Sequence, residues 1–327
     1  MSRINSVMKI DELVNIPTLE DIQAAAQRID RYIHNTPVLT SQTFDRQVKS
    51  RIFLKCENFQ KVGAFKIRGA TNAVFTLSED QVEQGVVTHS SGNHGAAVAM
   101  AARHRGIKAH VVMPNNAPKV KINAVRGYGA NVLLCEPTLA DRERKTETIR
   151  SKHGAYLIHP FNDPQVVAGQ GTIGLELIGQ VPELDTIIGP IGGGGLMSGI
   201  SIAAKAVNPK IHLFGAEPTG ADDAYRSLKT NKRVTHQTPD TVADGLLTVL
   251  SPLTFSILRD NLIGIITVTD EEIISAMRFI WERMKIIIEP SSAVPVAAVL
   301  KHPRKFANHR VGIVITGGNV DISKLPW

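Results

Sequence analysis

The sequence predicts an α/β protein built on two open parallel sheets. From Gly85 onward, short runs of apolar and β-branched residues alternate with segments of helical period. This alternation is typical of parallel βαβ units. The expected strands are 86–88, 110–113, 131–134 and 156–158, the expected helices between them are 94–104, 118–126 and 139–152, and similar units recur at 186–207, 211–216 and 311–315.

No Pro/Ser-rich linker, low-complexity stretch or internal repeat divides the chain. We therefore expect intertwined domains, a large discontinuous one from residues 1–77 and 156–327 and a small one from residues 78–155. In open α/β sheets, ligands bind beyond the carboxyl ends of the strands. The glycine-containing loops at 90–95 and 192–195 both fall at such ends, which predicts a site in the cleft between the domains.

Composition narrows the function classes. With 43% hydrophobic and 20% charged residues in a chain of 327, the protein has the profile of a globular protein with a sizeable core. The formal charge is +7, but the basic residues are scattered and only 5% of residues are aromatic, so we expect no nucleic-acid partner. Cys56 and Cys135 each lie in an apolar run and are expected to be buried thiols. With no signal-like or membrane-length apolar segment, we expect a cytoplasmic protein with no membrane partner.

Four consecutive glycines, Gly192 to Gly195, follow an apolar run and precede a helix-like stretch. A loop without side chains at a helix start points several backbone N–H groups and the positive end of the helix dipole at one place, which suits a phosphate. The spacing matches neither G-x-G-x-x-G nor a Walker loop, so neither a dinucleotide nor a P-loop nucleotide is favoured. The alternative is a flexible turn, but glycines lose much entropy on folding.

Three further segments carry candidate chemistry. Lys66 is flanked by apolar residues, and burial would lower its pKa and make it a nucleophile, although a lysine on a helix face gives the same pattern. The loop 90–95 offers backbone N–H groups with Ser and Asn side chains that suit a carboxylate or a ring hydroxyl, or a helix cap. Thr316 and Gly317 follow the last predicted strand and form at least a turn.

Together the segments 63–70, 90–95, 192–195 and 316–319 resemble the fold type II pyridoxal-phosphate enzymes, whose fold is that of the tryptophan synthase β chain. The similarity is greatest to the group that holds serine racemases and the serine/threonine and threo-3-hydroxyaspartate dehydratases. It covers the chain from about residue 36 to 321, in one order. It implies pyridoxal 5'-phosphate in the cleft and elimination of water and ammonia from a small β-hydroxy amino acid such as L-serine, L-threonine or threo-3-hydroxyaspartate.

The resemblance also implies roles for single residues. Lys66 would attach the cofactor, Asn93 would contact its ring oxygen and Thr316 its pyridine nitrogen. A hydroxyl does not hold that nitrogen protonated, which favours elimination or quick reprotonation over transamination. The phosphate would rest on Gly192, Gly193, Gly194, Gly195 and Leu196, and the substrate would lie on Ser90, Ser91, Gly92, Asn93 and His94.

Ser91 is the residue on which the expectation of racemase activity depends. In the racemases this serine is thought to stand on the cofactor face opposite the lysine, and inverting an α-carbon needs a proton carrier on each face. Ser91 could equally hydrogen-bond a carboxylate, and hydroxyaspartate dehydratases carry it too. Phe161 follows the dehydratases, and Thr316 replaces a serine of the racemase. We expect elimination, with racemase activity beside it.

The resemblance places a divalent cation site at Glu217, the carbonyl of Ala221 and Asp223, whose hard oxygens suit Mg²⁺, Mn²⁺ or Ca²⁺. Arg142 is a candidate for a second substrate carboxylate. The positions that bind a nucleotide in the racemase are only partly matched in this chain. The matching residues are Ser41, Lys61, Lys285 and Asn319, and the differing residues are Gln42, Val62 and Ala96. We therefore do not expect ATP to act as an effector. The family implies a homodimer. The rival functions are a β-replacing synthase of the cysteine-synthase kind and a non-catalytic sensor of a phosphate ligand.

Overall fold

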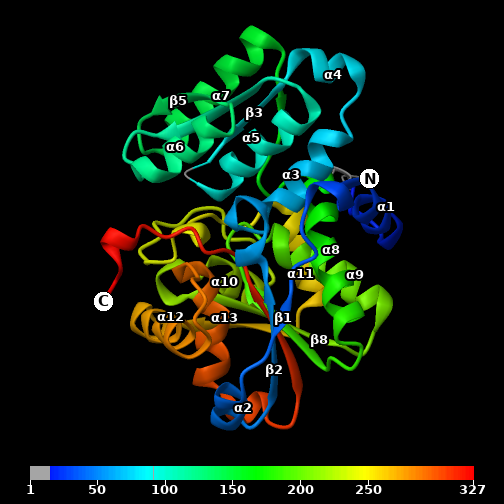
Figure 1. Cartoon of the computed structure of the whole chain (residues 1–327), viewed down its shortest axis with the longest axis vertical. Helices are drawn as coiled ribbons and strands as arrows, with labels where there is room; N and C mark the ends of the chain where they lie inside the picture. The colour runs from blue at the N-terminus through cyan, green and yellow to red at the C-terminus, as the bar shows by residue number, and fades with distance from the viewer. Residues whose placement is uncertain (1–14, 91) are drawn as a thin grey trace, which may run out of the picture.

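The computed structural model describes residues 15–90 and 92–327, which form two β-sheets with helices on both faces (Figure 1). The larger sheet has six strands in the order β1-β2-β10-β7-β8-β9, and the smaller has four in the order β5-β4-β3-β6. Every neighbouring pair is parallel except β1 with β2. The predicted class is confirmed, with one antiparallel strand added at an edge.

The strands are β1 (Val38–Leu39), β2 (Arg51–Cys56), β3 (Val86–His89), β4 (Ala109–Pro114), β5 (Asn131–Cys135), β6 (Tyr156–Leu157), β7 (Thr186–Pro190), β8 (His212–Pro218), β9 (Gly264–Val268) and β10 (Arg310–Ile315). The helices are α1 (Leu19–Ile29), α2 (Gln42–Val48), α3 (Lys66–Phe75), α4 (Glu79–Gln84), α5 (Asn93–Arg105), α6 (Lys119–Gly127), α7 (Leu139–His153), α8 (Pro164–Gln180), α9 (Gly195–Val207), α10 (Asp223–Thr230), α11 (Pro252–Asn261), α12 (Asp270–Met284), α13 (Pro290–Lys301) and α14 (Pro303–Phe306).

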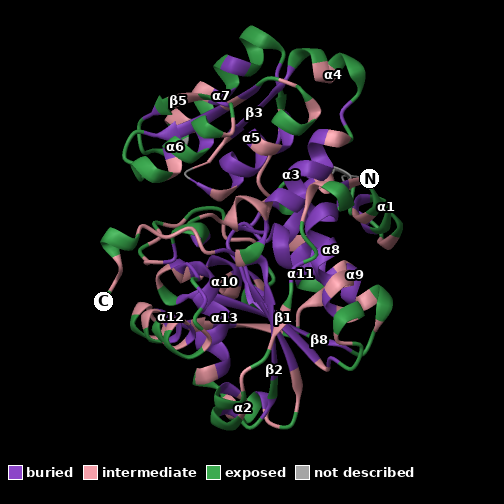
Figure 2. Cartoon of the chain, viewed as in Figure 1, coloured by how far each residue is buried: buried purple, intermediate pink, exposed green. Residues whose placement is uncertain are grey.

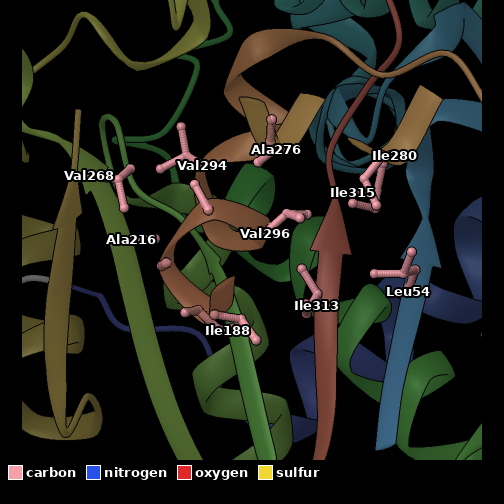
Figure 3. Close-up of a cluster of buried hydrophobic side chains, with 14 of the residues drawn as sticks. Leu54, Ile188, Ala216, Val268, Ala276, Ile280, Val294, Val296, Ile313 and Ile315 are labelled. Carbon is pink, nitrogen blue, oxygen red and sulfur yellow. The ribbon is translucent and has the colours of Figure 1, made fainter. Parts of the chain in front are cut away.

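Helices cover both faces of the large sheet. Because successive residues of a strand point to opposite faces, neighbouring side chains pack against different helices. Ile187 packs with α8, α9 and α11, whereas its neighbour Ile188 packs with α12 and α13. Figure 3 shows the second cluster, in which Val294 and Val296 of α13 lie among side chains of the sheet. The sheet is thereby held rigid under the loops at its carboxyl edge.

The small sheet repeats this arrangement. Val86 faces α5 and α6, and Val87 faces α7. The central strands of both sheets are buried, whereas the edge strands β1, β5 and β6 and the outer helix faces are more exposed (Figure 2). The sheet extends past the predicted boundary at residue 155, because β6 pairs with β3. Helix α3, assigned by sequence to the large domain, also contributes Ile67 and Ala70 to the core of the small sheet. The division into domains stays a prediction.

A buried ionic network fixes helix α3 from its other side. The fully buried guanidinium of Arg68 binds Glu57, with Nε to Oε2 at 2.7 Å, and Glu176 of α8, with Nη1 to Oε1 at 2.6 Å. Lys55 of β2 donates to the same Glu176 at 2.7 Å. Buried charges are tolerated only when they are paired and hydrogen-bonded as here. The network therefore joins β2, α3 and α8 next to the start of α3.

The cysteines and the apolar helices bear on two expectations from the sequence. Cys56 and Cys135 are both free and buried, as predicted. Within residues 15–90 and 92–327, no helix combines the length and the apolarity that crossing a bilayer requires.

Candidate active site

Lys66 is the first residue of α3 and lies between the two sheets. Its ammonium donates to the carbonyl of Pro160 at 3.0 Å and stands 5.1 Å from the centre of the Phe65 ring. Burial lowers the pKa of Lys66 to about 8, against an opposing effect of the Glu289 carboxylate. A neutral amine is therefore accessible near neutral pH, which a nucleophile or a proton carrier requires.

The segment that holds Lys66 also packs on the glycine loop. The ring of Phe161, next to Pro160, lies so close to Gly193 that a Cβ there would be 2.2 Å from its Cδ1. Gly194 has φ +85°, a conformation that favours glycine, and as N-cap of α9 it offers no side-chain cap. The first N–H groups of a helix have no acceptor within the helix. The loop thus presents backbone donors beside the amine of Lys66.

The loop 90–95 faces this region from the small sheet. Ser90 Oγ accepts the N–H of Gly92 at 3.1 Å, and Gly92 is the N-cap of α5 without a side-chain cap. The predicted residue Ser91 lies outside the described residues. The side chain of His94 is buried, and its Nε2 lies 3.0 Å from the carbonyl oxygen of Ile158, whereas its buried Nδ1 has no hydrogen-bond partner among the described residues. Burial holds the pKa of His94 well below its usual value.

Asn93 is held by two partners from distant segments. Its amide nitrogen donates to Glu289 Oε1 at 2.9 Å and Oε2 at 3.1 Å, and its oxygen accepts from Asn319 Nδ2 at 2.9 Å. Glu289 is buried, and burial together with the Asp244 carboxylate raises its pKa to about 7. The amide of Asn93 is therefore fixed in orientation at the start of α5.

Thr316 follows β10 and is buried, with 3% of its surface exposed. Its hydroxyl shares a hydrogen bond of 2.9 Å with Ser292 Oγ, and Ser292 also accepts the N–H of Gly317 at 2.8 Å. The backbone carbonyl of Thr316 accepts the N–H of Phe65 at 2.9 Å. Thr316 is thus tied directly to the residue before Lys66, and its group is a neutral hydroxyl rather than a carboxylate.

Two histidines and an arginine lie next to Phe161, at the ends of β3 and β6 and in α7. The rings of His89 and His159 lie 5.9 Å apart, and that of His159 lies 4.7 Å from Phe161. Burial and then the charge of Arg142 lower the pKa of His89 to about 4, and burial lowers that of His159 to about 3. In the described part of the chain, the buried Nε of Arg142 has no hydrogen-bond partner. His89 and His159 are therefore neutral near pH 7, and they lie in a row that ends at Phe161.

The residues of the predicted cation site lie near the end of β8 and at the start of α10. Glu217 is the last residue but one of β8 and accepts the N–H groups of Ala224 and Tyr225 at 3.1 and 2.7 Å, while Asp223 accepts a hydrogen bond from Gln237 Nε2 at 2.7 Å. Both carboxylates are fully buried. Burial, then the charge of Asp223, raises the pKa of Glu217, and burial raises that of Asp223 to about 6. Across residues 15–90 and 92–327, no three His, Cys, Asp or Glu side chains gather as a metal cluster.

Comparison with known proteins decides the family. A family model described as pyridoxal-phosphate dependent enzyme matches residues 29–317. The chain belongs to this family. Among its curated relatives, a serine racemase of Dictyostelium discoideum is 53% identical over 94% of this chain and 96% of its own length. A beta-hydroxyaspartate dehydratase of Paracoccus denitrificans is 48% identical over 95% and 99%. The solved structure of maize serine racemase superposes with a TM-score of 0.92, at 46% identity over 94% and 95%.

The cofactor of a pyridoxal-phosphate-dependent enzyme fits the residues present. The cofactor requires an amine, a phosphate cradle and a partner for its ring nitrogen. Lys66 supplies an amine whose pKa is lowered, the uncapped start of α9 supplies free N–H groups, and Thr316 supplies a hydroxyl. A side chain at Gly193 would fill the cradle.

Several residues of this site were not found from the sequence. Glu289 precedes Pro290 at the start of α13 and reads as a helix-capping acid. His159 and Pro160 stand before a loop, and their sequence gives no sign of a contact with Lys66. Ser292 lies within an apolar helix. Each acts through a contact with a distant segment, and such contacts leave no local pattern.

Proposed function

We propose that this protein is a pyridoxal-phosphate-dependent ammonia-lyase that converts a small β-hydroxy amino acid to a 2-oxo acid and ammonia. The observation that carries the proposal is the position of Lys66. Its amine, with a pKa of about 8, is bound to Pro160, and the adjoining Phe161 packs on the glycine loop. A protein that merely binds a phosphate has no use for such an amine.

Different residues would bind different parts of the cofactor. The N–H groups of Gly192 to Gly195 and Leu196 would hold its phosphate at the start of α9, Asn93 its ring oxygen and Thr316 its ring nitrogen. Bound pyridoxal phosphate supplies an aldehyde for the substrate amine and an electron sink for the pair left on Cα. The hydroxyl of Thr316 leaves the ring nitrogen unprotonated, which favours loss of the β-hydroxyl over transamination.

Lys66 is the proton carrier in this proposal. With the cofactor bound, the free amine of Lys66 would take the α-proton, and the β-hydroxyl would leave with one proton, so that the α-hydrogen and the hydroxyl depart overall as water. Burial keeps a substantial share of this amine neutral near pH 8. The carbonyl of Pro160 accepts one of its N–H bonds and orients the nitrogen. The product then takes up water and releases ammonia.

Substrate choice depends on the two sides of the cleft. The N–H groups at the start of α5, with Ser90, Ser91 and Asn93, suit the α-carboxylate. The guanidinium of Arg142, whose buried Nε has no hydrogen-bond partner among the described residues, suits a second carboxylate on the β-carbon, as in threo-3-hydroxyaspartate. L-serine and L-threonine lack that group, and they would leave Arg142 without its partner.

Racemisation is the second activity we propose. Serine racemases of several organisms are similar to nearly the whole chain. Ser91 would return a proton on the face opposite Lys66. We further propose that Glu217, the carbonyl of Ala221 and Asp223 bind Mg²⁺, Mn²⁺ or Ca²⁺, since a cation relieves the repulsion between two buried carboxylates. A cytoplasmic homodimer is the form we expect.

Product analysis tests the proposal. Holoenzyme is incubated with L-serine, L-threonine or threo-3-hydroxyaspartate, and ammonia, 2-oxo acid and the D-isomer are measured. We expect stoichiometric ammonia and 2-oxo acid with some D-serine, and no product from Lys66→Ala. Sulfide addition to O-acetylserine without ammonia release from serine would instead identify a β-replacing synthase. Binding of the cofactor with neither reaction would identify a sensor.

A further inference from the structure

Lys121 on α6 reaches from the small sheet toward the loop that precedes α5. A Cβ placed on Gly92 would lie 3.0 Å from Cδ and 3.4 Å from Nζ of Lys121. The side chain of Lys121 is only 15% exposed. Its aliphatic part therefore covers Gly92, the N-cap of α5, and its ammonium lies beside the backbone that the proposed function assigns to the substrate carboxylate.

The partner of Lys121 belongs to the large sheet's loops. Lys121 Nζ forms an ion pair with Oδ2 of Asp244, which begins the 3-10 turn Asp244–Leu246. This turn is itself fixed, because Gly245 N–H donates to Ser291 Oγ at 3.0 Å. It also lies against the glycine loop, since a Cβ on Gly192 would be 3.0 Å from the Cα of Leu246. One ion pair thus connects the two loops of the cleft.

The charges around this pair reinforce it. Burial opposes the ammonium, but the carboxylates of Asp244 and Glu289 together raise the pKa of Lys121. In turn, Lys121 lowers and Asp244 raises the pKa of Glu289, the residue that binds Asn93. Removal of Lys121 would leave Asp244 and Glu289 to repel each other beside the start of α5. The pair is therefore more than an isolated surface contact.

We propose that Lys121 and Asp244 form a latch between the two lobes that holds the α5 N-terminus over the glycine loop. Lys121 is then a positioning residue for the substrate carboxylate. The inference rests on the proposed function, which makes Gly92 and Asn93 part of the substrate site. A closed cleft excludes water and aligns the substrate, so loss of the latch weakens substrate binding more than it slows turnover.

The test compares single variants with a charge exchange. Lys121→Met, Asp244→Asn and the double variant Lys121→Asp with Asp244→Lys are assayed as holoenzymes for KM and kcat with L-serine. Lys119→Met, on the exposed face of the same helix, removes one charge without a partner in the described structure and is the matched control. We expect KM to rise about 10-fold in each single variant with kcat within about 2-fold. The charge exchange should restore KM to within about 3-fold of the wild type.

Hydrogen exchange gives a readout apart from activity. Amides of α6 and of the first turn of α5 are followed with and without glycine, which has the amine and the carboxylate but no leaving group. We expect faster exchange at α6 and weaker protection by glycine in the single variants only. The latch would be overturned if Lys121→Met kept the KM and the hydrogen exchange of the wild type. It would also be overturned if the KM of the double variant were as high as that of the single variants. A wild type without ammonia release would instead refute the proposed function, while the exchange of α6 without glycine still decides whether the latch exists.

Discussion

The Phe161 ring lies directly on Gly193, where an added Cβ would stand 2.2 Å from Cδ1 and 2.3 Å from Cε1. Phe161 follows Pro160, whose carbonyl accepts the Lys66 ammonium. The phosphate cradle and the amine are therefore positioned by a single segment. Any change that pushes this ring outward disturbs both the cradle and the lysine.

Gly193→Ala is predicted to weaken cofactor binding. The new methyl group must displace Phe161, because a contact of 2.2 Å is far below van der Waals distance. We expect the dissociation constant of pyridoxal phosphate to rise at least about 10-fold, a factor that 1.4 kcal/mol of strain produces. Fluorescence titration of the apoprotein with the cofactor measures it.

Gly179→Ala is the matched control for that variant. Gly179 lies in α8, and a Cβ there meets no atom within 4 Å. Alanine has the higher helix propensity by about 0.5 to 1 kcal/mol, so this variant should keep its cofactor affinity and gain slight stability. Equal cofactor affinity in both variants would show that Gly193 is not part of the cradle.

Arg142→Leu is predicted to change substrate preference. If the guanidinium binds the β-carboxylate, its loss removes a charge-assisted contact of about 1.5 to 3 kcal/mol. We expect kcat/KM for threo-3-hydroxyaspartate to fall about 10- to 100-fold, with a much smaller change for L-serine. Steady-state ammonia release with the two substrates measures the ratio.

Arg144→Leu serves as control, because its side chain lies on the same helix and is 68% exposed. It should leave the preference unchanged. An equal loss for both substrates in Arg142→Leu would assign Arg142 to the α-carboxylate or to folding instead.

Divalent cations are predicted to stabilise the protein through Glu217 and Asp223. A ligand that binds only the folded state at 100 times its dissociation constant adds about 2.7 kcal/mol. We expect Mg²⁺, Mn²⁺ or Ca²⁺ to raise Tm by several degrees and chelation to reverse the effect. Differential scanning fluorimetry at fixed pH provides the measurement.

In Glu217→Gln the cation should no longer shift Tm, whereas the exposed substitution Asp260→Asn should keep the full shift. Without cation, Glu217→Gln should be at least as stable as the wild type, because burial and the charge of Asp223 already disfavour the ionised form of Glu217. The same Tm response in both variants would place the cation elsewhere.

The sequence predicted local features well and long-range contacts poorly. Alternating strands and helices, and the glycine turn after β7, have local patterns, and the structure contains them where they were expected. Asn93 was identified by its loop, but its partner Glu289 is 196 positions away. Nothing near Glu289 distinguishes it from an ordinary acid before a helix, and the Lys121–Asp244 pair is equally hidden.

His94 shows a further limit of local reasoning. Its place in the loop 90–95 predicts a contact with the substrate, but the loop's sequence does not reveal that the imidazole is buried with its Nε2 3.0 Å from the carbonyl oxygen of Ile158. A buried side chain at a helix start packs on the sheet beneath it, and a linear motif does not reveal which way it turns. The domain boundary at residue 155 stays a prediction, and the pairing of β6 with β3 beyond it could not be predicted from the residues of β6 alone.

Chemical mapping of the bound cofactor is the most direct test of whether Lys66 attaches it. The holoenzyme is reduced with borohydride and digested with trypsin, and the pyridoxyl group is located by mass spectrometry. We predict the pyridoxyl group on Lys66, within a peptide of residues 62–68, because the modified lysine resists cleavage. A pyridoxyl group on any other lysine, or a protein that binds the cofactor and yields no modified peptide, would contradict it.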